Sequence, residues 1–150
     1  MHRIALRGMG TLVLVAVLMA LAGCSGPICR VKVVNEGDYP LTSVRLVPFF
    51  EDAEEQDEAW VEAVNLLPRD ADENTIAVDS GKIALLPHLL EGKLYYVEVI
   101  YYIDGVYVEQ LWDNLLDLTE IEENALVTMN VSCEILGDAT VPTFAFYFEY

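Results

Sequence analysis

The sequence has little positive charge and little histidine, and these shortages exclude several classes of protein. Its 150 residues include 8 Lys and Arg against 25 Asp and Glu, a formal net charge of −17 at pH 7. Such an excess of acid repels phosphates, so we expect no nucleic-acid partner. With only two histidines, His2 and His88, a metal centre or catalytic triad that needs several imidazoles is not expected. We predict that the protein is not an enzyme.

Apolar residues, in contrast, are abundant. They make up 54% of the chain, which also contains 8 Tyr, 5 Phe and 2 Trp. This content is too high for a disordered acidic tail and is sufficient for one hydrophobic core. A chain of this length therefore forms one globular domain with at most a short appendage.

The first 23 residues have the layout of an export signal. Arg3 and Arg7 precede an uninterrupted apolar run from Leu12 to Ala22, which small residues extend to Cys24. The run is shorter than the ~20 residues that a membrane-spanning helix needs, which favours cleavage. An uncleaved membrane anchor is the alternative.

The four residues Leu21, Ala22, Gly23 and Cys24 resemble the lipobox of bacterial lipoproteins. The resemblance implies that the Cys24 thiol takes a diacylglyceryl group and that the signal is cut just before it. Ser25 follows, where an Asp would resemble an inner-membrane retention signal, so the expected location is the cell envelope, lipid-anchored to the outer membrane or cell surface. The alternative is an ordinary export signal with a chance Cys.

This interpretation divides the chain into a signal peptide (1–23), a lipidated Cys with its tether (24–27) and a folded domain (28–150). Cleavage removes Arg3 and Arg7 but no acid, which leaves six basic and 25 acidic residues and a formal charge of −19. The domain is then held close to an anionic membrane that its own charge disfavours.

Two further cysteines, Cys29 and Cys133, remain in the mature chain. An even number of cysteines in an exported protein predicts a disulfide, and one between these two closes a loop of ~100 residues. Two buried free thiols are the alternative.

The mature sequence consists mainly of short β-branched and aromatic runs separated by turn formers. One segment, 51–66, differs: it has six acids between Glu51 and Glu58, and Trp60, Val61 and Val64 recur at helical spacing. We predict an antiparallel immunoglobulin-like β-sandwich of about seven strands with one short helical insertion. The expected strands cover 28–34, 42–48, two runs within 94–112, 125–133 and 141–148, with strand fragments around 76–78 and 82–86.

The order of these segments resembles a loosely defined group of small exported β-sandwich proteins. The opening strand contains Val31, Val33 and Asn35, and Trp60 and an Asn-Leu-Leu stretch at 65–67 follow it. The resemblance implies the fold and says almost nothing about activity.

The clearest local signal is a hairpin that turns at Asp104 and Gly105, a pair that suits a two-residue type I′ turn. This turn pairs residues 98–103 with residues 111–106 and gives the hairpin two different faces. One face is expected to point into the core. Its members are Tyr95, Val97, Val99, Tyr101, Ile103, Val106, Val108, Gln110 and Trp112.

The opposite face of the hairpin is a candidate binding surface. It combines rings, which stack on ligands, with carboxylates, which accept hydrogen bonds, as sites for sugars or peptides do. The candidate residues are Tyr96, Glu98, Tyr102, Tyr107 and Glu109. The alternative is that the aromatic pairs only stabilise the sheet and that the 51–66 helix or another sheet covers this face.

A calcium site is the second hypothesis. Asp70, Asp72 and Asn74 alternate like the first ligands of an EF-hand loop, but Thr75 and Gly81 occupy the places of its required Gly and Glu. Only a looser cation site is compatible with this pattern, and an acidic solvated face is the alternative. The sequence thus favours a membrane-tethered, noncatalytic envelope module that binds protein or glycan or has a structural role; a calcium-binding surface domain is the alternative.

Overall fold

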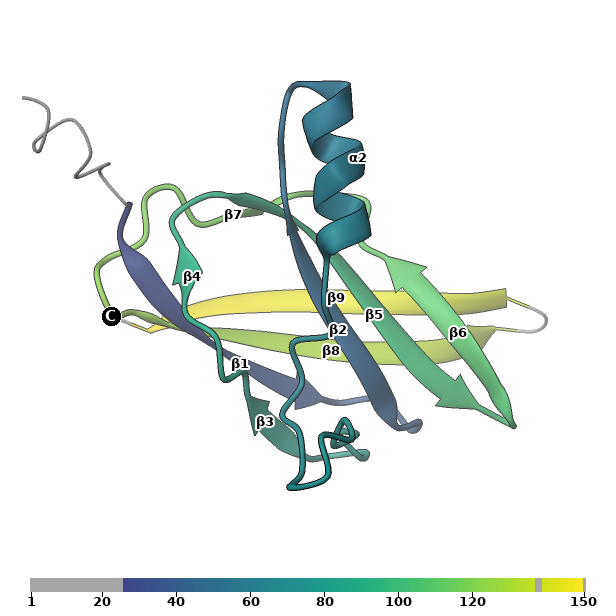
Figure 1. The fold of residues 1–150 in the computed structure, drawn as a ribbon. Coiled ribbons are helices and arrows are strands. Elements are labelled where there is room, and N and C mark those ends of the chain that lie inside the picture. Colours follow the sequence, from purple (N-terminus) through teal and green to yellow (C-terminus); the bar gives the residue numbers. More distant parts are fainter. Residues whose placement is uncertain (1–25, 137–138, 150) are drawn as a thin grey trace, which may run out of the picture.

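Two β-sheets and one helix make up the part of the chain that the structure, a computed structural model, describes: residues 26–136 and 139–149 (Figure 1). The prediction of a mainly β fold with one short helix is confirmed. The described elements are β1 (Ile28–Asn35), β2 (Leu41–Pro48), α2 (Ala53–Glu62), β3 (Ile83–Leu85), β4 (Leu90–Glu91), β5 (Leu94–Ile103), β6 (Val106–Leu111), β7 (Leu116–Asp117), β8 (Leu126–Leu136) and β9 (Ala139–Glu149).

The sheets differ in strand direction. The four-stranded sheet has the order β2-β5-β6, with β7 also on β5, and is antiparallel. The five-stranded sheet has the order β3-β1-β8-β9, with β4 also on β1, and in it β1 and β8 run parallel. An antiparallel sandwich of about seven strands was predicted; the described residues form nine strands, and β1 and β8 depart from the antiparallel arrangement. Parallel neighbours need a long connection, and here the chain passes through the other sheet between β1 and β8.

The core lies between the two sheets. Alternate residues of β1 and β8 point inward from the five-stranded sheet, and alternate residues of β5 point inward from the other. Both sets belong to one cluster of buried side chains, an arrangement consistent with a β-sandwich. Fully buried members include Val31, Val33, Val97, Val99, Tyr101, Val127 and Met129.

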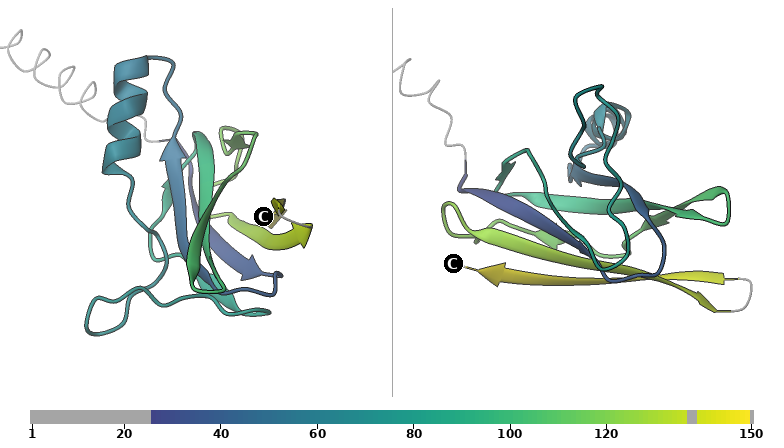
Figure 2. Two further views of the ribbon diagram at one scale, coloured as in Figure 1. Left: turned by 90° about the vertical axis from the view of Figure 1, so that its right-hand side faces the viewer. Right: turned by 90° about the horizontal axis from the view of Figure 1, so that it is seen from below.

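The β5–β6 hairpin has the expected register. All six pairs between 98–103 and 106–111 are present, and Asp104 (φ 47°) and Gly105 (φ 90°) form the turn with the positive φ that a type I′ turn requires. One expected core residue, Val106, is instead 61% exposed. It directly follows the turn, where the hairpin extends to one end of the sheet (Figures 1 and 2).

The predicted disulfide between Cys29 and Cys133 is absent, because both cysteines are buried free thiols. They lie on the neighbouring parallel strands β1 and β8, but Arg30 pairs with Leu126, which places Cys133 about eight residues, roughly 26 Å, further along than Cys29. A disulfide needs Cα atoms within ~7 Å, so these strands keep the thiols apart. Burial raises the pKa of both thiols.

The helix α2 is shorter than predicted and buries none of its residues. It begins after Asp52, whose carboxylate accepts hydrogen bonds from the backbone N–H groups of Glu54 and Glu55. It ends because Ala63 is extended and the chain then turns along β2. Val61, expected on its packed face, is 86% exposed, because the helix projects from the end of β2 (Figure 1).

The two ends of the domain have different features. β1 begins and β9 ends at the same end, whereas the β5–β6 turn and the start of β2 lie at the other (Figures 1 and 2). Pro27, a residue of the expected tether, is fixed to the domain because its carbonyl accepts a hydrogen bond from the N–H of Gly92 at 2.7 Å. None of the helices described in 26–136 and 139–149 has the length and apolar character to cross a membrane.

Candidate functional site

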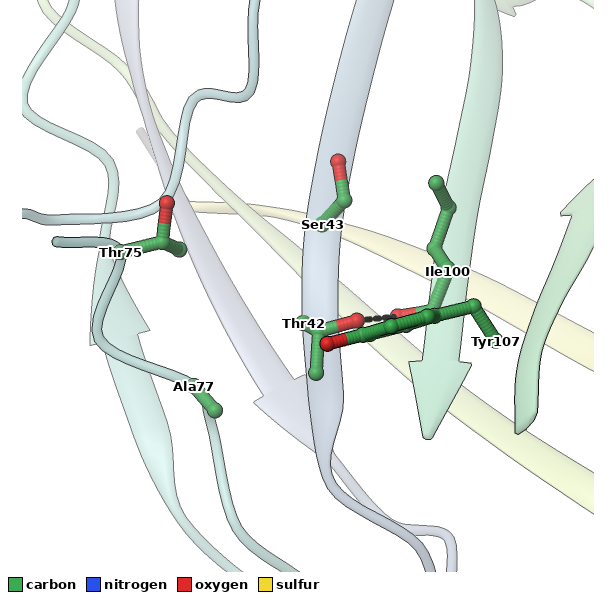
Figure 3. Close-up of a pocket in the computed structure, with 6 residues that line it drawn as sticks. All are labelled: Thr42, Ser43, Thr75, Ala77, Ile100 and Tyr107. Atoms are coloured by element: carbon green, nitrogen blue, oxygen red, sulfur yellow. Dashed lines mark hydrogen bonds between the residues drawn. The ribbon is translucent and has the colours of Figure 1, made fainter. Parts of the chain in front are cut away.

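A shallow groove of about 400 Å³ lies on the outer face of the four-stranded sheet, at the end that carries the β5–β6 turn (Figure 3). Its floor comes from β2 and β5, one side from β6, and the other from the segment that precedes β3. None of the lining side chains is charged, and three of them carry aliphatic hydroxyls. The lining residues are Thr42, Ser43, Thr75, Ala77, Ile100 and Tyr107.

A β-bulge in β2 forms the floor of the groove. Leu41 pairs with Tyr101 and Ser43 pairs with Ile100, so Thr42 is an extra residue with no partner of its own in the ladder. Its hydroxyl donates a hydrogen bond to the Ile100 carbonyl at 2.9 Å (Figure 3). Bulges redirect side chains, and this one brings two consecutive hydroxyl residues to the groove.

Asn65 holds the bulge in place. Its Nδ2 donates to the Thr42 carbonyl (2.9 Å) and to the Thr75 hydroxyl oxygen (3.4 Å). Its Oδ1 accepts from the N–H groups of Val44 and Leu67, each at 3.1 Å. One side chain therefore links the floor of the groove to the side formed by Thr75. This role was not predicted from the sequence, in which Asn65 stands out only as the first residue of the Asn-Leu-Leu stretch.

Two of the predicted site residues, Tyr102 and Tyr107, meet beside the groove. They are directly opposite each other on β5 and β6, and their ring centroids are 5.1 Å apart. Tyr102 is 42% exposed and Tyr107 is 69% exposed. Figure 3 shows the Tyr107 ring extending from β6 toward Thr42, with Thr75 and Ala77 across the groove. The pair thus offers accessible aromatic surface next to the hydroxyls.

The other predicted tyrosine, Tyr96, lies apart from the groove near the opposite end of β5. Its ring packs against Phe49 at 5.9 Å and against Trp60 of α2 at 5.6 Å. The predicted single binding face is therefore divided. The expected covering by the helix segment is present at Tyr96, whereas the surface at Tyr102 stays open.

Between these two regions lies a charged cluster of Arg45, Glu98 and Glu109. Arg45 and Glu98 are directly opposite on β2 and β5, and the Arg45 Nε donates to a Glu98 carboxylate that is only 3% exposed. The charge of Glu98 and a hydrogen bond with it raise the pKa of Glu109, which Arg45 partly opposes. Glu98 is thus committed to an ion pair, whereas Glu109 stays exposed opposite Ile100, which lines the groove.

The calcium candidates Asp70, Asp72 and Asn74 lie in a short exposed loop that they hold together themselves. The Asp70 carboxylate accepts hydrogen bonds from the N–H groups of Asp72 and Asn74, both at 2.9 Å. The bond from Asn74 is the main cause of the lowered pKa of Asp70. Within 26–136 and 139–149, no three His, Cys, Asp or Glu side chains converge in a way that could hold a metal ion.

Comparisons with known proteins found no relative of this chain. No protein-family model matches it, and neither the curated proteins nor the solved structures contain a match. The groove is therefore interpreted from its own residues and their geometry.

Proposed function

We propose that this protein is a noncatalytic binding module of the cell envelope, tethered through a lipid on Cys24, that takes a protein or glycan ligand in the groove. The observation that carries the proposal is the exposed Tyr107 ring next to three hydroxyl side chains in an uncharged groove. Few polar groups that converge beside accessible aromatic surface are the usual composition of a binding site. An immunoglobulin-like sandwich is the finer fold assignment within this proposal.

The position of the groove agrees with tethering at the N-terminus. β1 starts at Ile28, and its eight residues extend roughly 25 Å toward the end at which β2 begins with the groove residues. Pro27 is already fixed to the domain, so only Ser25 and Gly26 separate it from Cys24. A lipid on Cys24 therefore places the groove at the end of the domain away from the membrane.

Lipid anchoring to the membrane is tested by the substitution Cys24→Ala in the native host. We expect the unchanged chain to fractionate with membranes and to carry a diacylglyceryl mass increment on its N-terminal peptide. The substituted chain should lack this increment and fractionate differently. An unsubstituted chain whose first peptide carries no lipid would contradict tethering.

Binding is tested by co-sedimentation of the full chain, in detergent, with purified envelope polysaccharide and with purified envelope proteins. Retention is the fraction of the chain that sediments together with the ligand. We expect Tyr107→Ala to reduce retention on one of these ligands at least tenfold. The matched control is Tyr147→Ala, because Tyr147 is similarly exposed (56%) but lies on β9 of the other sheet. Equal retention of both variants, or no retention of the unchanged chain, overturns a binding role of the groove.

A further inference from the structure

The backbone at the floor of the groove has no free edge for a peptide. β5 pairs with one edge of β2, and the segment 65–78 occupies the other. Leu66 N–H donates to the Val44 carbonyl at 2.8 Å, and Leu41 and Val78 exchange both of their backbone hydrogen bonds. A peptide therefore cannot add to β2 as a further strand. Recognition at the floor of the groove therefore relies on side chains.

The hydroxyls that line the groove have complementary free roles. The Thr42 hydroxyl uses its proton on the Ile100 carbonyl, so it offers an acceptor to a ligand. The Thr75 hydroxyl oxygen accepts from Asn65, so its proton is available to donate. A ligand that bonds to both must itself present donors and acceptors close together. Sugar hydroxyls do so, and the C–H face of a sugar ring packs on an aromatic ring such as Tyr107.

The charge around the groove argues for a ligand without charge. The lining has no charged side chain, and the net charge of the chain is −17, which disfavours anionic ligands. None of the lining side chains supplies a carboxylate to a cationic ligand, and Glu98 on the same face is paired with Arg45. Glu109 is exposed and lies opposite the lining residue Ile100, where its carboxyl group can accept hydrogen bonds from sugar hydroxyls.

We propose that the groove binds an uncharged carbohydrate chain, with one sugar ring packed on Tyr107 and its hydroxyls bonded to Thr42, Thr75 and Glu109. This inference rests on the proposed binding function and specifies its ligand class. The groove is shallow and open, so it fits a segment of a longer polymer better than an enclosed small molecule.

The test is calorimetric titration of the full chain in detergent with uncharged hexasaccharides of glucose, N-acetylglucosamine, mannose, xylose and galactose. An anionic hexagalacturonate and a cationic glucosamine hexamer are titrated in parallel. We expect at least one uncharged hexamer to bind more tightly than both charged ones. Tyr107→Ala should weaken its affinity at least tenfold, Tyr107→Phe should largely retain it, and Tyr147→Ala should not change it.

The hydroxyl roles are tested by Thr42→Val and Thr75→Val, which keep the side-chain shape. Each should weaken binding of the hexamer three- to tenfold, while the melting curve of each variant reports whether the fold is retained. If no uncharged hexamer binds, or a charged one binds more tightly, the carbohydrate inference is overturned. In that case, Tyr107-dependent retention on purified envelope proteins would still support the binding function, and its absence would overturn both.

Discussion

The outer face of the four-stranded sheet has two ends that use the same type of residue differently. Near the start of β5, Tyr96 is covered by Phe49 and by Trp60 of α2. Near its other end, Tyr102 pairs with Tyr107, and both rings remain accessible. Alternation along a strand therefore assigns a tyrosine to a face of the sheet but does not determine whether its ring is covered or accessible. The accessibility of the ring depends on what the rest of the chain places over that face.

A buried ion pair separates the two ends. Glu98 alternates with Tyr96 and Ile100 on the outer face, yet it is as buried as a core residue. A carboxylate removed from water is costly unless it is paired, and here Arg45 supplies the opposite charge. The charged cluster thus lies between the end at Tyr96, which is closed, and the end at Tyr102 and Tyr107, which is open.

The largest effect is expected from Arg45→Met, which removes the partner of Glu98 and leaves an uncompensated buried charge. We expect the free energy of unfolding at pH 7 to fall by about 3–5 kcal/mol. Urea unfolding followed by fluorescence of the two tryptophans measures this loss. It tests whether the stability of the fold depends on the ion pair between Arg45 and Glu98.

The double variant Arg45→Met, Glu98→Met is the control, because it removes both charges and keeps comparable volume. It should recover most of the lost free energy of unfolding. A loss below about 1 kcal/mol in the single variant would contradict the burial of Glu98, and an equal loss in the double variant would attribute the effect to packing.

The local features of the fold could be predicted because they depend on neighbouring residues. The Asp104–Gly105 turn sets the register of its hairpin, and every pair that follows from it is present. The aromatic pair Tyr102 and Tyr107 follows from that register alone. The candidate site could be located to this extent from the sequence.

The remaining features depend on contacts between distant segments, and the sequence gives no local signal for them. The groove needs the bulge at Thr42, which is held by Asn65 more than twenty residues later. The burial of Glu98 needs Arg45 on another strand. The disulfide prediction failed for the same reason, because the parity of cysteines says nothing about the register in which β1 and β8 pair.

An intermediate effect is expected from truncating one ring at each end. Trp60→Ala removes a half-buried indole from Tyr96, and we expect a loss of about 1–3 kcal/mol in the free energy of unfolding. Tyr107→Ala removes an exposed cross-strand partner and should cost less than about 1 kcal/mol. Urea unfolding of both variants gives the comparison directly. A loss at Tyr107 equal to that at Trp60 would mean that the open end, too, is primarily structural.

The smallest effect is expected at the boundary, from Glu109→Gln. Glu98 raises the pKa of Glu109, so the folded state holds this proton more tightly than the unfolded state does. The resulting stabilisation is fully present below the ordinary glutamate pKa of 4.5 and is lost as pH rises through the raised value. A neutral Gln does not undergo this loss. The variant should therefore be more stable than the unchanged chain at pH 7, by less than about 1 kcal/mol because the site is exposed.

Thermal unfolding of both chains from about pH 4 to pH 7 measures this difference. Its size should grow with pH, and it should shrink when both chains also carry Glu98→Gln, because that substitution removes the charge that causes the shift. A difference that is constant over this range would show that Glu109 does not interact with Glu98 in solution. The open end of the face would then be electrostatically independent of the closed end, and Glu109 could be treated as part of the groove alone.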